Sequence, residues 1–185
     1  MRRVVVFFAF LLVGLPAISS LPARAADEAL SAEANKAFLM DNAKKQGVIV
    51  RPDGLQFKIL QNGFGRRPTV TDTVQVYYTG VLINGTIFDG TSPGLPASFK
   101  ANSVIPGWIE ALTLMREGDH WQLVIPANLA YGDRGAANGL IPPNQTLVFD
   151  LRLIATKPAA RRGDPDYVPD PNDPQDKAML EQMNR

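Results

Sequence analysis

The sequence predicts an α+β domain in which antiparallel strands pack one apolar face against a single short helix. Apolar and polar residues alternate repeatedly between residues 48 and 157, which is the period of strands with one buried face. An Asn84-Gly85 pair between two such runs indicates a two-residue hairpin, and therefore antiparallel pairing. The segment Trp108–Met115 instead has helical spacing, with four apolar residues on one face: Trp108, Ala111, Leu112 and Met115. A helix and a sheet that each have one apolar face bury those faces against each other.

Residues 1–25 have the pattern of a secretory signal peptide. The pattern has three parts: Arg2 and Arg3, the apolar run Val4–Leu15, and the small residues of Ala23-Arg24-Ala25. An uncleaved membrane anchor is the alternative, but a spanning helix needs about 20 apolar residues and this run has about a dozen. We therefore expect cleavage before Ala26 and, in a bacterium, a protein of the periplasm (or a secreted one) without a stable membrane anchor.

The region 26–47 is expected to hold one N-terminal helix. Asp27–Gln46 has a modest apolar stripe, Asp27 as a candidate cap and Gly47 as a left-handed stop. A single helix of this length is marginal alone in water, so it must dock. We favour docking on its own domain, and docking on a second copy of the chain is the alternative.

Strand patterns fill the region 48–157, which we expect to form one domain. The runs are Leu55–Ile59, Val74–Thr79, Trp121–Ile125 and Leu147–Leu153. Between the helix and the third run, a glycine-centred turn is expected to leave the carboxylates of Glu117 and Asp119 in solvent, so that they form no acid pair.

The last segment, 158–185, is rich in proline and aspartate. Such a composition lacks the apolar area that would offset ordering entropy, so we expect an extended or disordered tail. Asp173 followed by Pro174 is the pattern of a helix start, which predicts a final short helix running to Asn184.

Composition excludes several classes of chemistry. The chain has 185 residues, 45% apolar and 20% charged, as expected for one globular domain with appendages. It has no cysteine and one histidine, so thiol chemistry, disulfides and Cys- or His-cluster metal sites are excluded. That histidine, His120, is expected at a strand edge without a catalytic role. The sequence therefore disfavours hydrolytic and redox chemistry, and predicts no metal and no cofactor.

Charge argues against a nucleic-acid partner. The chain has 19 basic and 18 acidic residues, and residues 1–25 hold three arginines and no acidic residue. Without these residues, 16 of the 19 basic residues remain against 18 acidic ones. Because nucleic-acid affinity depends on neutralising phosphates, we expect no nucleic-acid binding.

Three stretches are distinctive when taken together. They are Val76–Asp89 (VYYTGVLINGTIFD), Val104–Trp108 (VIPGW), and Leu129–Asp150 with its LAYG, IPPN and LVFD motifs. Together they resemble the FKBP-type peptidyl-prolyl cis-trans isomerase domain, over the continuous range Val48–Thr156. Within that family, Asp41–Val48 (DNAKKQGV) and Gly54-Leu55-Gln56 are similar to the macrophage infectivity potentiator subgroup, whose members are secreted or surface-associated bacterial isomerases.

The resemblance implies a half-barrel sheet curled around the short helix, with an apolar pocket between them that receives a proline ring. It assigns Trp108 to the floor, and it assigns to the walls Tyr78, Phe88, Val104, Ile105 and Phe149, with Leu140 and Ile141 closing the pocket. Asp89 and the Tyr131 hydroxyl are the implied polar contacts and, with Phe88, the implied catalytic residues. The Ile105 N–H is implied to donate to a substrate carbonyl. Phe99 is expected to be plain core.

The implied reaction suits this residue inventory. Rotation about a peptide bond faces a barrier of about 18–20 kcal/mol, and no bond is broken, so neither an acid, a base nor a metal is required. The implied partners are proline-containing polypeptide clients, with macrolides such as rapamycin as inhibitors.

Two departures from the family pattern favour an alternative function. The arginine that many members carry after the aspartate is missing from Gly90–Pro96, and Ala97 replaces an aromatic wall. The alternative is a proline-binding chaperone or adaptor with incidental catalysis. A further alternative is a surface factor that recognises proline-rich host or matrix proteins.

Overall fold

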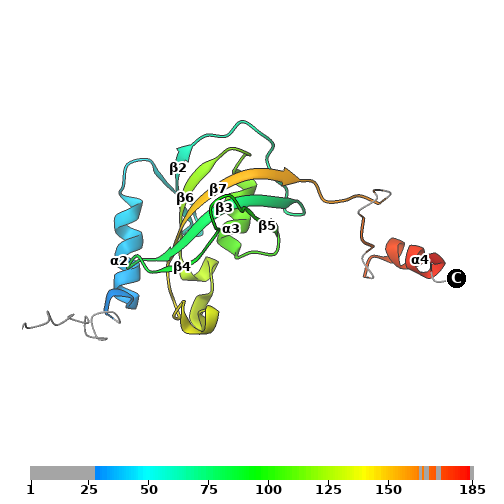
Figure 1. The fold of residues 1–185 in the computed structure, drawn as a ribbon. Helices are drawn as coiled ribbons and strands as arrows, with labels where there is room; N and C mark the ends of the chain where they lie inside the picture. Colours follow the sequence, from blue (N-terminus) through cyan, green and yellow to red (C-terminus); the bar gives the residue numbers. More distant parts are fainter. Residues whose placement is uncertain (1–27, 163, 165–166, 170–171, 184–185) are drawn as a thin grey trace, which may run out of the picture.

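An antiparallel sheet wraps around one helix in the computed structural model, which describes residues 28–162, 164, 167–169 and 172–183 (Figure 1). The predicted signal peptide and its cleavage site lie outside these residues. No helix among the described residues is both long enough and apolar enough to span a bilayer. The helices and strands are α2 (Ala32–Ala43), β1 (Val48–Val50), β2 (Gln56–Gln61), β3 (Thr73–Leu82), β4 (Ile87–Gly90), β5 (Ala97–Lys100), α3 (Pro106–Leu114), β6 (His120–Ile125), β7 (Leu147–Lys157) and α4 (Pro174–Met183).

The strands are ordered β1-β2-β6-β7-β3-β4, with β5 also paired to β3, in a seven-stranded sheet within the described residues. Neighbouring strands of this sheet run antiparallel throughout. The sheet curves around α3, as Figure 1 shows, and this confirms the α+β fold with a sheet wrapped around a short helix. Alternate residues of the long strands are fully buried, among them Val74, Val76, Leu123, Leu151 and Leu153.

Helix α3 lies with its apolar face on this sheet. The four residues expected on that face, Trp108, Ala111, Leu112 and Met115, are all buried. The helix begins at Pro106, two residues before the predicted start, because proline fits the first helical position, where no N–H is needed. It ends at Leu114, and Met115 is the cap residue.

The turn between β3 and β4 differs from the expected two-residue hairpin. The Leu82 N–H donates to the Thr86 carbonyl at 2.9 Å, and the Gly85 N–H donates to the Leu82 carbonyl at 2.9 Å, so three residues form the loop. Gly85 has a φ of 87°, the left-handed conformation that this type of loop requires at its last residue.

Helix α2 docks on its own chain, as the sequence favours, but through amides. It is shorter than the predicted Asp27–Gln46, because Ser31 caps its start and Lys44 its end. Its buried residues are Asn35 and Asn42. The domain therefore buries two polar residues of this helix, and not the predicted apolar stripe.

Two buried amide pairs fasten α2. The Asn35 side chain donates to Gln145 Oε1 at 3.1 Å and accepts from the Thr146 N–H at 2.7 Å. Two turns further on, Asn42 donates to Gln56 Oε1 at 2.9 Å. Thr146 immediately precedes β7, so α2 is tied directly to the start of a central strand.

Truncating Asn35 should destabilise the fold. Asn35→Ala leaves the buried Thr146 N–H without an acceptor, which we expect to lower the free energy of unfolding by about 2 kcal/mol. Urea denaturation measures this loss. Lys36→Ala, at the neighbouring exposed position, should change stability by less than about 0.5 kcal/mol. Equal effects of the two substitutions would contradict the role of the amide.

The turn before β6 differs from the expected solvated turn. Asp119 is buried, and its carboxylate accepts from the backbone N–H groups of Gly63 and Arg116. The Glu117 carboxylate accepts from the Thr156 N–H at 2.6 Å and from the Arg66 N–H at 3.3 Å. The expectation that both carboxylates are solvated is therefore wrong for Asp119, because the loop between β2 and β3 folds over this turn.

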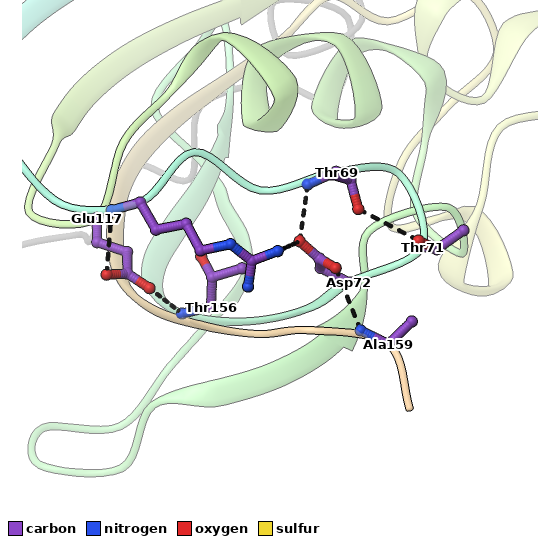
Figure 2. A network of polar contacts seen from close by, with 7 residues as sticks. Thr69, Thr71, Asp72, Glu117, Thr156 and Ala159 are labelled. Carbon is purple, nitrogen blue, oxygen red and sulfur yellow. Dashed lines mark hydrogen bonds and ion pairs between the residues drawn. The ribbon is translucent and has the colours of Figure 1, made fainter. Parts of the chain in front are cut away.

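A third carboxylate completes the attachment of that loop (Figure 2). Asp72 accepts from the Thr69 N–H at 2.8 Å and the Ala159 N–H at 3.2 Å, and pairs with the Arg66 guanidinium at 2.6 Å. Figure 2 shows both carboxylates inside this network, with Glu117 hydrogen-bonded to Thr156 and Asp72 hydrogen-bonded to Thr69 and Ala159. The carboxylates of Asp72, Glu117 and Asp119 thus fix the loop 62–72 to the body of the domain.

The tail leaves the sheet after β7 and ends in α4 (Figure 1). The predicted final helix is present: it begins at Pro174, and the Asp173 carboxylate accepts from the N–H of Gln175 at 2.8 Å. Arg162 holds this helix to the preceding segment, since it pairs with Asp176 at 2.7 Å.

Candidate active site

A cavity of about 350 Å³ opens beside α3, where the β7–β3–β4 side of the sheet faces the first turn of the helix. Its walls come from β3, β4, β5, β7, α3 and the loops before α3 and after β6. The lining residues are Tyr78, Phe88, Asp89, Phe99, Ser103, Val104, Ile105, Trp108, Tyr131 and Phe149.

The Trp108 indole is the aromatic centre of this cavity. It is 4% exposed, and three rings stand edge-to-face around it: Tyr78 at 5.1 Å, Phe149 at 5.2 Å and Phe99 at 6.0 Å between centroids. Edge-to-face packing is the favoured geometry of aromatic pairs, so the indole is held in one orientation. Its Nε1 is buried and has no hydrogen-bond partner among the described residues.

The Phe88 and Phe149 rings form a cavity wall that packs against Gly80, and this packing requires that residue 80 has no side chain. A Cβ there would lie 2.6 Å from Phe88 Cζ and 2.8 Å from Phe149 Cε1, closer than real Cβ contacts. The Phe88 and Phe149 rings pack edge-to-face at 5.5 Å between centroids. Gly80 therefore allows both aromatic rings to lie close against the strand.

A β-bulge explains how two consecutive residues reach the same cavity. Successive strand residues normally point to opposite faces, yet Phe88 and Asp89 both line the cavity. The β3–β4 register shifts here, since Gly80 pairs with Asp89 and Val81 pairs with Ile87. Phe88 is thus the extra residue of the bulge, a device that redirects side chains beside functional sites.

The polar side of the cavity is built around Asp89. Its carboxylate accepts from the Tyr78 hydroxyl at 2.7 Å and from the Gly90 N–H at 2.8 Å. Burial, followed by this hydrogen bond, raises the pKa of Tyr78 well above its ordinary value. Among the described residues no cation forms an ion pair with Asp89, which agrees with the missing arginine in Gly90–Pro96.

Tyr131 shares this polar side of the cavity, in the loop after β6. Tyr131 is 40% exposed, and partial desolvation of its phenol, followed by the negative charge of Asp89, raises the pKa of Tyr131 above its ordinary value. Both phenols of the site therefore keep their protons at neutral pH and can donate hydrogen bonds.

Ile105 offers a backbone donor at the edge of the cavity. It is the cap residue of α3, and its carbonyl accepts from the N–H groups of Trp108 and Ile109 at 2.9 and 3.1 Å. Within the part of the chain that the structure describes, nothing accepts from the Ile105 N–H. That N–H is available to a ligand carbonyl.

The structure gathers eight of the residues assigned from the resemblance: Tyr78, Phe88, Asp89, Val104, Ile105, Trp108, Tyr131 and Phe149. It does not place the other two in the lining. Ile141 is buried in the core, and Leu140 is exposed on the loop before β7. Their role in closing the pocket stays a prediction.

Two lining residues are not expected from the sequence. Phe99, expected as plain core, lies on β5 and packs against both Tyr78 and Trp108. Ser103 lies in the turn that follows β5. Phe99 is placed toward the cavity by the pairing of β5 with β3, in which Phe99 lies opposite the buried Val74, and this pairing is not visible in the sequence.

Comparison with known proteins agrees with this geometry. Residues 65–154 match the family described as FKBP-type peptidyl-prolyl cis-trans isomerase, and residues 19–59 match the domain amino-terminal to it. The chain is 50% identical over 142 residues to "Outer membrane protein MIP" of Legionella longbeachae, covering 74% of this chain and 60% of the relative. It is 53% identical over 128 residues to the FKBP-type 22 kDa peptidyl-prolyl cis-trans isomerase of Escherichia coli, covering 69% and 61%.

A solved structure shares the fold. The crystal structure of a peptidyl-prolyl cis-trans isomerase from Pseudomonas syringae superposes with a TM-score of 0.64 at 38% identity, covering 76% of this chain and 99% of that one. This chain spans about 60% of the length of the two curated relatives, from Legionella and Escherichia coli. The resemblance to the macrophage infectivity potentiator proteins is also confirmed, since relatives carrying that name match at 46% and 49% identity. The chain belongs to the family of FKBP-type peptidyl-prolyl cis-trans isomerases.

Proposed function

We propose that this protein catalyses cis–trans isomerisation of X-Pro bonds in exported polypeptides, by holding a twisted prolyl amide over the Trp108 indole. The observation that carries the proposal is the open cavity of about 350 Å³ whose floor and walls are aromatic rings fixed edge-to-face. Family membership supports the same reaction.

The chemistry follows from how an amide loses its resonance. The planar amide carries separated charge, with a negative oxygen and a positive nitrogen, and the twisted transition state carries less. An apolar cavity therefore favours the twisted form relative to the planar one. A thousandfold acceleration requires about 4 kcal/mol, which is within reach of ring burial and a few hydrogen bonds.

The polar groups of the cavity have distinct roles in this proposal. The Ile105 N–H and the Tyr131 hydroxyl donate to carbonyl groups of the substrate and hold its backbone. The Asp89 carboxylate, held in place by Tyr78 at 2.7 Å, disfavours the planar amide because that form has the more negative oxygen. Phe88 and Phe149 enclose the proline ring.

Export is part of the proposal and has separate support. Residues 1–25 have the pattern of a signal peptide, and one relative is named an outer membrane protein. We infer that proline-containing polypeptides of the periplasm or cell exterior are the clients. Macrolides such as rapamycin are the expected inhibitors.

Removing the polar groups should lower the rate of isomerisation. The assay measures isomerisation of a short X-Pro peptide by the mature chain. We expect kcat/KM to fall about tenfold for Asp89→Ala and about threefold for Tyr131→Phe, because each variant loses roughly one hydrogen bond or charge contact to the substrate. Asp133→Ala and Tyr77→Phe, which remove the same groups outside the cavity, should leave the rate unchanged.

Rapamycin and pH give two further readings of the same assay. Rapamycin should abolish the wild-type rate, and the rate should be flat between about pH 6 and pH 9, because both site tyrosines have raised pKa values and stay protonated there. An inactive wild type that still binds proline peptides would favour the adaptor function, which the absence of a described cation paired with Asp89 motivates.

A further inference from the structure

A second hollow, of about 450 Å³, lies between the loop 62–72 and the ends of β2, α3 and β6. We call it the arginine hollow. Its apolar lining residues are Ile59, Phe64, Leu114 and Trp121, and its charged ones are Arg67, Arg116 and Asp119. It shares no lining residue with the candidate active site.

The apolar part of the arginine hollow is aromatic. Trp121 is buried at its base and stacks on Phe57 with 4.4 Å between ring centroids. Phe64 stands at its rim and is 94% exposed, the most exposed of the large apolar side chains among the described residues. An exposed aromatic ring beside an apolar hollow is typical of a surface that contacts a partner.

The exposure of Phe64 is built into the fold, because the loop that carries it is fixed. Next to it, the Gly63 N–H donates to the buried Asp119 carboxylate. A Cβ on Gly63 would lie 2.2 Å from the Glu117 carbonyl oxygen, so the loop backbone sits directly on the turn. The ring therefore cannot withdraw from water by a small movement of the loop.

Two arginines and one buried carboxylate, that of Asp119, line the hollow, and neither arginine side chain forms an ion pair with a described residue. The Arg67 guanidinium donates to the Thr113 carbonyl at 3.5 Å, and the Arg116 guanidinium to the Gly65 carbonyl at 3.4 Å. The neighbouring acids, Glu117 and Asp119, accept from backbone N–H groups instead.

We propose that the arginine hollow is a second polypeptide-binding site, for an extended acidic segment. The segment places a carboxylate at Arg67 and Arg116 and an apolar side chain against Phe64. The two arginines favour a carboxylate by charge complementarity. The hollow is concave with an aromatic base, so it fits an inserted apolar side chain more closely than it would fit the flat surface of a bilayer. This binding is independent of the proposed function. A client bound at the arginine hollow would also raise the local concentration of its prolyl bonds at the candidate active site. This second effect rests on the proposed isomerase function.

The two tryptophans report separately on the two sites. Trp108 lines the candidate active site and Trp121 lines the arginine hollow, so the two indole N–H resonances of the ¹⁵N-labelled mature chain distinguish them. The probe is a short, proline-free peptide of alternating aspartate and leucine. It should shift the Trp121 resonance and leave the Trp108 resonance unchanged, whereas the lysine–leucine analogue should shift neither.

Charge reversal tests the role of the arginines. Arg67→Glu combined with Arg116→Glu should weaken peptide binding about tenfold or more, from the loss of two exposed ion pairs and their replacement by repulsion. Phe64→Ser should weaken it as well. Lys36→Glu, a single charge reversal of the same kind on α2, should not. All of these variants should isomerise a short X-Pro peptide at the wild-type rate.

Several results would overturn the proposal. They are an unshifted Trp121 resonance, equal binding of the lysine–leucine peptide, or unchanged affinity after reversal of both arginines. Binding of phosphatidylglycerol vesicles through Phe64 without peptide binding would assign the hollow to a membrane surface instead. A Trp121 shift that depends on protein concentration alone would assign it to a second copy of the chain.

Discussion

Replacing Gly80 with alanine should lower kcat/KM for a short prolyl peptide by about 100-fold, because a wall displaced by about 1 Å misplaces the bound substrate. The new Cβ would lie 2.6 Å from the Phe88 ring and 2.8 Å from the Phe149 ring. Phe149 is buried and packs on Trp108 at 5.2 Å, so it has little room to move. Phe88, which is only partly buried, must move instead, and this changes the shape of the cavity that it lines.

The adjacent residue of β3 supplies the control for this experiment. Thr79 is exposed on the other face of the strand, so Thr79→Ala should keep wild-type kcat/KM. Gly80→Ala should remain folded, since overpacking of this kind costs about 1–3 kcal/mol. A folded Gly80→Ala variant with full activity would show that the position of the Phe88 and Phe149 rings does not matter for catalysis.

Asp72→Asn should lower the free energy of unfolding by about 3 kcal/mol, a larger loss than we expect for Asn35→Ala. Asp72 is 2% exposed, and its carboxylate serves three donors, on Arg66, Thr69 and Ala159 (Figure 2). The amide nitrogen of asparagine would turn a donor toward at least one of them. The loop 62–72 and the start of the tail would both lose an attachment.

The same residue predicts how stability depends on pH. Burial alone would raise the pKa of Asp72, but hydrogen bonds from Thr69 and Ala159 and the charge of Arg66 outweigh burial and hold the pKa below 3.8. Because the pKa of Asp72 is lower in the folded than in the unfolded chain, the ionised carboxylate stabilises the fold at any pH above the unfolded-state pKa. This contribution is lost as pH falls through the lower, folded-state pKa.

Urea denaturation at neutral and at acid pH measures both effects. The difference between wild type and Asp72→Asn should be full at pH 7 and should shrink as the pH falls below about 4. Asp133→Asn, at an exposed position, should match wild type at both pH values. A difference that stays constant down to the lowest pH would show that ionisation of Asp72 does not stabilise the fold.

Much of the domain follows from local pattern. The α+β class, the buried face of α3 and the final helix starting at Pro174 all follow from periodicity and capping residues, and the structure has each of them. Helix α2 is the instructive exception. Its pattern predicts an apolar stripe, but Asn35 and Asn42 are the side chains that the domain buries, because their partners Gln145 and Gln56 lie on other elements.

The candidate site divides in the same way. Trp108, Phe88 and Asp89 belong to motifs whose spacing carries the family pattern, and they meet in one cavity. Phe99 does not stand out in the sequence, since nothing local separates a strand aromatic that lines a cavity from one that lies in the core. The burial of Asp119 is equally hidden, because the loop that covers it comes from residues 62–72, far away along the chain.

The sequence by itself determined the α+β class of the domain, since period and capping are properties of neighbouring residues, and its resemblance to a family assigned Trp108, Phe88 and Asp89 to one pocket. Only the tertiary structure decided that Gly80 makes room for two rings, that Asp72 joins a loop to the tail, and that neither Arg67 nor Arg116 forms an ion pair with a described residue. Each of these depends on distances between segments remote in sequence, and such distances exist only once the chain has packed.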